Sequence, residues 1–145
     1  MIVIDSNIFA KQFIDEHDSE QAKAFFKYCI ENKTPLFAPT LFTYEVLQIT
    51  VYYHHPIEDA LQRIESYLAF NLTLEELQKS DWLQVEKMIA SGHKKSGYPS
   101  LYDSSYHILA KSKGCIFLTA DKRHKAKTEK AGNITLLKDW AELFQ

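Results

Sequence analysis

The sequence predicts an α/β protein in which helices flank both faces of a central, mostly parallel sheet. Short apolar runs at residues 2–4 and 116–118 contain no alternating polar positions, which is typical of strands buried on both faces. Longer segments between such runs place apolar residues three and four positions apart, which is helical spacing. Strands that alternate with helices favour parallel pairing through helical crossovers. We therefore expect a parallel sheet between two helical layers.

The individual elements follow from apolar spacing and from boundary residues. The predicted strands cover residues 2–5, 35–38, 71–74, 115–119 and 134–137. The predicted helices cover residues 18–32, 39–55, 57–70, 75–91, 100–113 and 121–131, and a terminal helix carries Trp140 and Leu143. The order of these elements repeats strand and helix along nearly the whole chain, as a parallel sheet requires.

Boundary residues support the helices of the first half. Asp18 or Ser19 can cap the helix that runs to about residue 32. Pro39-Thr40 opens the next helix, and His54-His55-Pro56 ends it because proline disfavours helical backbone in the residue before it. The helix at 57–70 is expected to bury an apolar stripe of Leu61, Ile64 and Leu68.

The second half of the chain is more basic, and its helix and strand boundaries are marked more clearly. The helix at 75–91 has a possible break at Ser80-Asp81, and the loop at 93–99 is basic and contains Gly97. Ser100 opens the helix at 100–113 in a capping-box spacing with Asp103. The predicted strand at 115–119 is followed by the lysine-rich helix at 121–131.

Length and composition indicate one ordinary globular domain over residues 1–145. The chain has 145 residues, of which 46% are hydrophobic and 25% charged. No apolar run approaches the roughly 18 residues that span a membrane, and the start Met-Ile-Val-Ile-Asp lacks the basic region of a signal peptide. We therefore expect a cytoplasmic protein without a membrane segment. Cys29 and Cys115 lie far apart in apolar contexts, so buried reduced thiols are expected.

The net charge of −2 conceals an asymmetry along the chain. Residues 1–75 carry 5 basic and 11 acidic side chains, whereas residues 76–145 carry 12 basic and 8 acidic. The segment 94–130 alone has 9 basic residues against 3 acidic ones. Basic patches attract nucleic-acid phosphates, although a solvated lysine-rich helix face has the same composition.

Four acidic residues occur where burial disfavours a charge. They are Asp5, Glu45, Asp103 and Asp121. Asp5 and Asp121 each follow a predicted buried strand, at the sheet edge where ligands bind in such folds. Helix capping is the alternative for both, and for Asp103 the first turn of a capped helix. Glu45 has apolar residues at three of its four helical neighbours, and no basic residue lies between Lys33 and Arg63. A distant salt bridge or an exposed edge is its alternative.

If the fold gathers these four acids, they form an all-oxygen cation site. Buried carboxylates are costly unless they are paired or bind a cation. Oxygen ligands favour Mg²⁺ or Mn²⁺, and such ions suit phosphodiester hydrolysis.

The motifs around these acids together resemble a PIN domain, the fold of a large group of metal-dependent ribonucleases. Within that group the chain most resembles VapC-like toxins of type II toxin–antitoxin modules. The segments are IVIDSNIF at 2–9, PTLFTYEV at 39–46, YDSSYHILA at 102–110, FLTADKR at 117–123 and LLKDW at 136–140. The resemblance covers nearly the whole chain, and it implies a three-layer α/β/α fold.

The resemblance implies endonucleolytic hydrolysis of RNA with Mg²⁺ or Mn²⁺. Asp5 and Asp103 would be direct ligands, and Asp121 a third, direct or through water. Glu45 would bind a second ion or orient the attacking water. The residues expected to hold ligands or water, or to contact substrate, are Thr119, Ser6 and Asn7.

The resemblance also implies macromolecular partners. The residues expected to guide the RNA backbone are Lys94, Lys95, Lys122, Arg123, Lys125 and Lys127. These contacts give affinity and not sequence choice. Toxins of this kind usually form homodimers and are inhibited by a small antitoxin that enters the active-site groove.

One departure from the family pattern lies in the helix after Asp103. That helix usually carries small residues, and here it carries Ser105, Tyr106 and His107. His107 can act as a proton donor near the acids, or it can be a packed or solvent-facing histidine.

Three other functions fit parts of the pattern. A receiver-like signalling domain also uses an α/β fold and Mg²⁺, but Asp5 has no acidic neighbour, which that site requires. A PIN-like nuclease can act in RNA processing outside a toxin–antitoxin pair. A non-catalytic RNA-binding module can share the fold, although a pure binder has no use for four costly acids.

Overall fold

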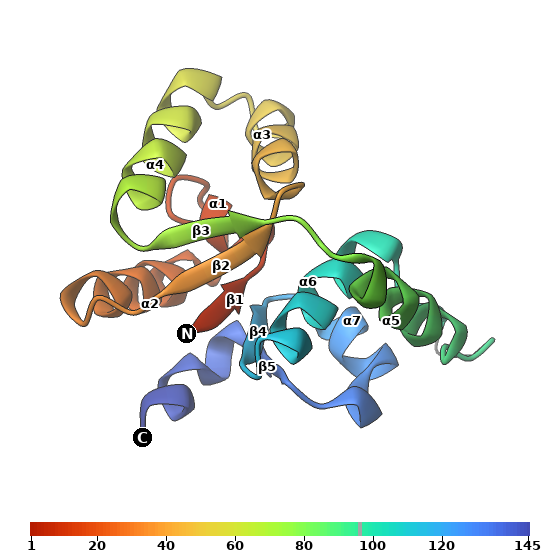
Figure 1. Cartoon of the computed structure of the whole chain (residues 1–145). Coiled ribbons are helices and arrows are strands. Elements are labelled where there is room, and N and C mark those ends of the chain that lie inside the picture. Colours follow the sequence, from red (N-terminus) through yellow and green to blue (C-terminus); the bar gives the residue numbers. More distant parts are fainter. Residues whose placement is uncertain (96) are drawn as a thin grey trace.

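A computed structural model describes residues 1–95 and 97–145 of the chain. Five parallel strands form one sheet in the order β3-β2-β1-β4-β5 (Figure 1). The strands are β1 (Ile2–Ile4), β2 (Leu36–Pro39), β3 (Leu72–Glu75), β4 (Ile116–Thr119) and β5 (Ile134–Leu136). The chain runs outward from β1 to β3 and then crosses to β4 on the other side of β1. In parallel sheets of this kind, ligands bind in a crevice at the carboxyl ends of the strands where the order reverses, which here is between β1 and β4.

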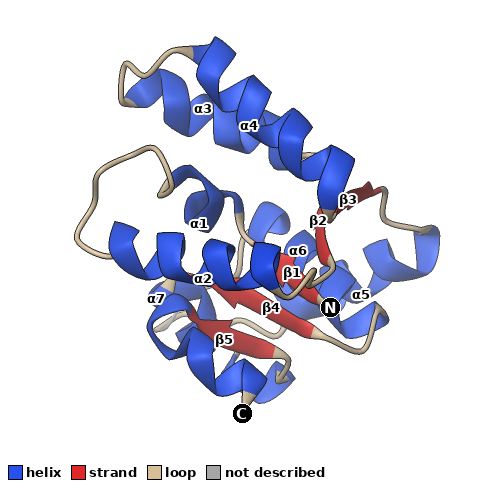
Figure 2. Cartoon of the chain, turned by 90° about the vertical axis from the view of Figure 1, so that its left-hand side faces the viewer, coloured by secondary structure: helices blue, strands red, loops and turns tan. Residues whose placement is uncertain are grey.

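Helices cover both faces of the sheet, as predicted. They are α1 (Ser6–Ala10), α2 (Ser19–Glu31), α3 (Phe42–Tyr52), α4 (Ile57–Phe70), α5 (Lys79–Ala90), α6 (Leu101–Ser112) and α7 (Lys122–Lys127), with 3-10 helices η1 (Glu129–Ala131) and η2 (Leu137–Phe144). Figure 2 shows α2 in front of the sheet and α6 behind it, where α6 contacts β1, β2 and β4. The predicted three-layer α/β/α arrangement is therefore confirmed.

An aromatic cluster around Phe9 ties the short helix α1 to three other helices. The Phe9 ring is fully buried, and its centroid lies 5.6 Å from that of Phe26, 5.2 Å from that of Phe42 and 5.2 Å from that of Tyr67. Edge-to-face aromatic contacts of this kind add to the free energy of burial. Because Asp5 lies at the start of α1, this packing fixes the backbone that presents Asp5.

Most element boundaries lie within one or two residues of the predictions. The exceptions are helix α1, which was not predicted, and the ends of α3, α5 and α7; α3 starts at Phe42 because Pro39 pairs in β2. Helix α5 starts at Lys79 and not at residue 75, because Glu75 pairs in β3 and because Gln78 and Asp81 form a capping box. The basic helix α7 ends at Lys127, before a separate 3-10 turn. The terminal segment is 3-10 helix.

The predicted apolar stripe of α4 was partly wrong. Leu68 is 43% exposed, and the buried residues of the helix are Ala60, Ile64 and Tyr67. The Tyr67 ring packs in the cluster around Phe9. Contacts with the other helices therefore bury position 67 in place of the predicted position 68.

Two predictions concern the whole chain. No helix in the described part is both long and apolar enough to cross a membrane. Cys29 and Cys115 are both free thiols; Cys29 is buried, as predicted, and Cys115 is half-buried.

Candidate active site

Asp5 lies at the centre of the sheet edge, directly after β1. It caps α1, and its carboxylate accepts a hydrogen bond from the backbone N–H of Asn7 at 3.4 Å. The Thr119 hydroxyl at the end of β4 donates to Asp5 Oδ2 at 2.6 Å. The Asp5 side chain is only 4% exposed. The capping alternative is therefore realised, and it leaves Asp5 buried in the crevice.

Glu45 approaches Asp5 through a shared hydroxyl group. It lies in the first turn of α3 and is half-buried. Ser6 Oγ lies 3.3 Å from Asp5 Oδ1 and 3.5 Å from Glu45 Oε1. A single hydroxyl proton thus faces two carboxylates from different elements. The prediction that Glu45 points inward is confirmed.

Asp103 and Asp121 both lie at helix starts. Ser100 Oγ accepts from the Asp103 backbone N–H at 3.0 Å, so Asp103 occupies the first turn of α6. Asp121 Oδ1 caps α7 by accepting from the N–H groups of Arg123 and His124 at 2.8 and 3.0 Å. The Asp121 backbone N–H also donates to Thr119 Oγ1 at 3.0 Å. Thr119 therefore links the positions of Asp5 and Asp121.

The carboxylates influence one another electrostatically. Burial raises the pKa of Asp5 to about 7, and the negative charges of Asp103 and Glu45 add to this effect. Burial and the charge of Asp103 raise the pKa of Glu45. Burial and the charge of Asp121 raise the pKa of Asp103. These three acids are consequently held where ionisation is unfavourable, as expected of a functional site.

In the described part of the chain, no cationic side chain forms an ion pair with any of the four acids. Among the described residues, none of the ion pairs involves Asp5, Glu45, Asp103 or Asp121. Within the same residues, no three His, Cys, Asp or Glu side chains lie close enough to hold a metal ion as they stand. The donor set fits Mg²⁺ or Mn²⁺ in chemistry, since it consists of oxygen atoms with unbalanced charge. The side chains have to draw together to enclose such an ion.

Two of the three accessory residues, Ser6 and Thr119, contact Asp5 through their side chains. Ser6 and Thr119 donate to Asp5, as described above. Asn7 contributes its backbone N–H, and its side-chain oxygen is buried without a hydrogen-bond partner.

The predicted basic residues lie on two surfaces. A Cβ atom added to Gly97 would lie 3.1 Å from Lys127 Cε, so Lys127 packs against the turn that carries Lys94 and Lys95. The positive charge of Lys127 also lowers the pKa of Asp103. Lys127 therefore lies on the Asp103 side of the site, with the turn that carries Lys94 and Lys95 packed beside it. Lys122 lies on a different surface.

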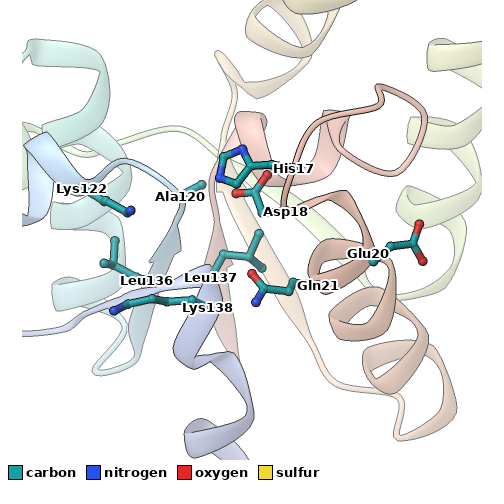
Figure 3. Close-up of a pocket in the computed structure, with 9 residues that line it drawn as sticks. All are labelled: His17, Asp18, Glu20, Gln21, Ala120, Lys122, Leu136, Leu137 and Lys138. Carbon is teal, nitrogen blue, oxygen red and sulfur yellow. The ribbon is translucent and has the colours of Figure 1, made fainter.

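Lys122 lines a hollow of about 310 Å³ at the carboxyl ends of β4 and β5 (Figure 3). Its wall carries Lys138, and also His17 and Asp18, which immediately precede α2. The figure shows these side chains on opposite sides of the hollow, with Ala120 between them and close to His17. The mixture of acidic and basic side chains does not mark it as a purely anionic or cationic site. Arg123 is exposed and Lys125 is half-buried on α7.

Comparison with solved structures gives a clear relationship. The chain is similar to the crystal structure of VapC20 from Mycobacterium tuberculosis, a toxin that cleaves the sarcin–ricin loop. The TM-score is 0.63 at 13% sequence identity, and the alignment covers 79% of this chain and 84% of VapC20. The chain has the PIN-like fold that its motifs predict. No protein-family model matches the sequence, and no curated protein matches it significantly.

Within this PIN-like fold, His107 has a structural environment. It is fully buried, its Nε2 lies 2.6 Å from the carbonyl oxygen of Gly132, and its Nδ1 lies 3.1 Å from His124 Nε2. The expectation of a packed histidine is confirmed, and both ring nitrogens of His107 already have partners other than the four acids. The sequence carries no signal for this pair, because the partners are brought together only by the packing of α7 on α6.

Tyr106 is the site residue that sequence reasoning missed. Its ring is fully buried and stacks on Phe117 at 5.7 Å between centroids. Its hydroxyl lies beside Glu45 and Ser6, and it lowers the pKa of Glu45. Only the spacing of three residues from Asp103 hinted at this position, because such residues share one side of a helix.

Proposed function

We propose that this protein is a metal-dependent endoribonuclease and the toxin of a type II toxin–antitoxin module. The observation that carries the proposal is the pair of buried Asp5 and half-buried Glu45, joined by Ser6 at the carboxyl end of β1. The charge of Asp103 acts on Asp5 and that of Asp121 acts on Asp103, and no ion pair in the described chain neutralises any of the four. The likeness to an RNA-cleaving toxin supports RNA as the substrate.

Each acid has a role that follows from its position. Asp5 and Asp103 would hold Mg²⁺ or Mn²⁺, and Asp121 would offer Oδ2, since Oδ1 caps α7. Glu45 would hold a second ion or accept the proton of the attacking water. When bound, such an ion would supply a water of lowered pKa and stabilise charge on the scissile phosphate. Ser6 and Thr119 hold Asp5 in one orientation through their hydroxyl groups.

Basic residues guide the RNA backbone towards these acids. Lys127, with Lys94 and Lys95 on the adjoining turn, offers phosphate contacts beside Asp103. Lys122, Arg123 and Lys125 extend the basic surface along α7 towards the hollow in Figure 3. Phosphate contacts give affinity that depends on salt, without sequence preference. Such a nuclease would act in the cytoplasm, where its RNA substrates are translated or assembled.

The proposal includes two protein partners, a second copy of the chain and a small antitoxin. Helix α3 exposes apolar and aromatic side chains, with Tyr44 81% exposed and Tyr52 74% exposed. Large exposed apolar patches are typical of protein interfaces. Size-exclusion chromatography with light scattering tests the homodimer. Co-expression with the product of a small adjacent open reading frame tests the antitoxin.

The nuclease is tested by incubating structured RNAs with purified protein in Mg²⁺, Mn²⁺ or EDTA. We expect cleavage only with a divalent ion, and a loss of at least about 100-fold in rate for Asp5→Asn. Asp15→Asn is the matched control, because Asp15 is an exposed aspartate in the loop after α1. If the wild type binds RNA but cleaves it with neither ion, the protein is a non-catalytic RNA-binding module.

A further inference from the structure

The Tyr106 hydroxyl is a buried donor without a regular partner. The residue is 0% exposed, and no hydrogen bond of normal geometry is made by its oxygen. Leaving a buried hydroxyl unpaired is unfavourable for folding, and a phenylalanine at the same position avoids this cost. The other strongly buried tyrosine, Tyr67, donates to Gln12 Oε1 at 2.8 Å. The Tyr106 hydroxyl therefore calls for a functional explanation.

The fold directs this hydroxyl at the acids. Tyr106 follows Asp103 by three residues on α6, and its ring is held flat against Phe117 of β4 at an interplanar angle of 23°. The hydroxyl consequently ends next to the Glu45 carboxylate and the Ser6 hydroxyl. Burial raises the pKa of the phenol, and the negative charges of Asp5 and Glu45 raise it further, so Tyr106 stays a neutral donor.

A count of donors explains why a second hydroxyl is needed. Ser6 has one proton, and it faces both Asp5 Oδ1 at 3.3 Å and Glu45 Oε1 at 3.5 Å. Thr119 already serves the other Asp5 oxygen. When Ser6 donates to Asp5, Glu45 has no dedicated donor in this network. Tyr106 is the unpaired donor beside an unpaired acceptor.

We propose that Tyr106 is a positioning residue of this site, whose hydroxyl donates to Glu45 and fixes one of its carboxylate oxygens. The other oxygen then points at the crevice, where it can ligate a cation or accept a proton from water. This inference rests on the proposed nuclease function, but the proposed contact joins two side chains of the protein and does not require an ion. It concerns a position at which the motif pattern usually has a small residue.

The test uses the full chain with Tyr106→Phe, which removes only the hydroxyl. Tyr67→Phe is the matched control, because it removes a buried hydroxyl that serves Gln12. We expect Tyr106→Phe to lower kcat for RNA about tenfold while KM changes less than twofold. We also expect Mn²⁺ affinity, measured by calorimetry without RNA, to fall several-fold.

A second readout does not depend on activity. Carbon-13 NMR of the glutamate carboxyl groups, with Glu45→Gln to assign the signal, gives the pKa of Glu45 in metal-free protein. Loss of the Tyr106 hydroxyl should raise that pKa, whereas Tyr67→Phe should leave it unchanged. An unchanged Glu45 titration in Tyr106→Phe overturns the inference, as does wild-type kcat and Mn²⁺ affinity. A wild type that cleaves no RNA refutes the nuclease instead, and the Glu45 titration still decides the contact.

Discussion

At the residue scale, the buried histidine pair has a single arrangement of protons. The carbonyl of Gly132 can only accept, so His107 Nε2 carries a proton and donates to it. His107 Nδ1 is then an acceptor, and His124 Nε2 must donate to it. His124 Nδ1 remains a bare acceptor, buried and without a partner. Both rings are therefore neutral, and each is in the Nε2–H tautomer.

This pair predicts acid sensitivity of the fold. Burial lowers the pKa of His107 and His124 to about 4, and the charge of His124 adds to the effect on His107. The unfolded chain binds both protons near pH 6.5, whereas the folded chain does not until about pH 4. Stability contributed by the pair is thus complete above about pH 6.5 and lost as the pH falls towards 4. The loss is at most about 1.4 kcal/mol per pH unit for each ring.

Urea unfolding at pH 7 and pH 5 measures this effect. His124→Gln removes one titrating ring, so we expect its free energy of unfolding to fall less than that of the wild type over this interval, by about the contribution of one ring. His17→Gln, at an exposed histidine, is the control. Asp5 titrates in the same range with opposite sign, so only the difference between variants is informative. Equal losses in all three proteins would show that the pair does not titrate as described.

Residues also show how far the sequence alone leads. Asp5, Asp103 and Asp121 were predictable as site candidates, because strand ends and helix starts are local features. The inward direction of Glu45 followed from helical spacing. Tyr106 was not predictable as a partner of Glu45, because the contact joins α6 to α3. Lys11 was missed as well: it is 6% exposed and pairs with Glu16 and with Asp18 at 2.8 Å.

At the element scale, α7 joins the acidic crevice to the basic surface. Its first residue follows the capping residue Asp121, and its last, Lys127, packs against Gly97. The helix is shorter than predicted. Thr128 is buried, and its hydroxyl donates to the carbonyl of His124 at 2.7 Å as the helix ends. The amino-acid pattern continued past this point, and only the tertiary position of Thr128 explains the end.

This arrangement predicts the salt dependence of RNA binding. Replacing Lys94, Lys95 and Lys127 with alanine removes up to three phosphate contacts. The slope of log K against log salt should then fall in magnitude by about 2, at roughly 0.7 per single-strand contact. Binding is measured in EDTA between 50 and 200 mM salt to prevent cleavage. The matched control replaces Lys23, Lys27 and Lys33 of α2 and its following turn, which removes the same charge elsewhere. Equal slopes for the two triple variants would place the RNA on another surface.

At the scale of the whole molecule, the candidate site draws one acid from each of four separate segments. Asp5 follows β1, Glu45 lies on α3, Asp103 starts α6 and Asp121 follows β4 by two residues. The sheet order could be anticipated only as parallel, since strand order depends on which crossovers reverse direction. That reversal between β1 and β4 is what brings segments more than 100 residues apart to one crevice. Bringing these charges together therefore lowers the free energy of unfolding of the whole domain.

Removing one of these charges should therefore stabilise the ion-free protein and weaken its binding of a cation. In EDTA at pH 8, Asp5→Asn should raise the free energy of unfolding by about 1–2 kcal/mol, or roughly 3–6 °C in Tm, because it removes a buried charge that Asp103 and Glu45 repel. The amide oxygen can still accept from Thr119. Millimolar Mn²⁺ should raise the Tm of the wild type, because it binds the folded state only, and should leave the variant nearly unchanged.

Thermal unfolding of the wild type, Asp5→Asn and Asp15→Asn, each with EDTA or Mn²⁺, decides this point. The Asp15→Asn control should follow the wild type in both conditions. A destabilised Asp5→Asn in EDTA would mean that hydrogen bonds from Thr119 and Ser6 outweigh the repulsion among the acids. A rise in Tm with Mn²⁺ that is equal in all three proteins would place the ion elsewhere. We expect Asp5→Asn to have a higher Tm than the wild type in EDTA and to show almost no rise in Tm with Mn²⁺. Only a cation site built around Asp5 produces both results.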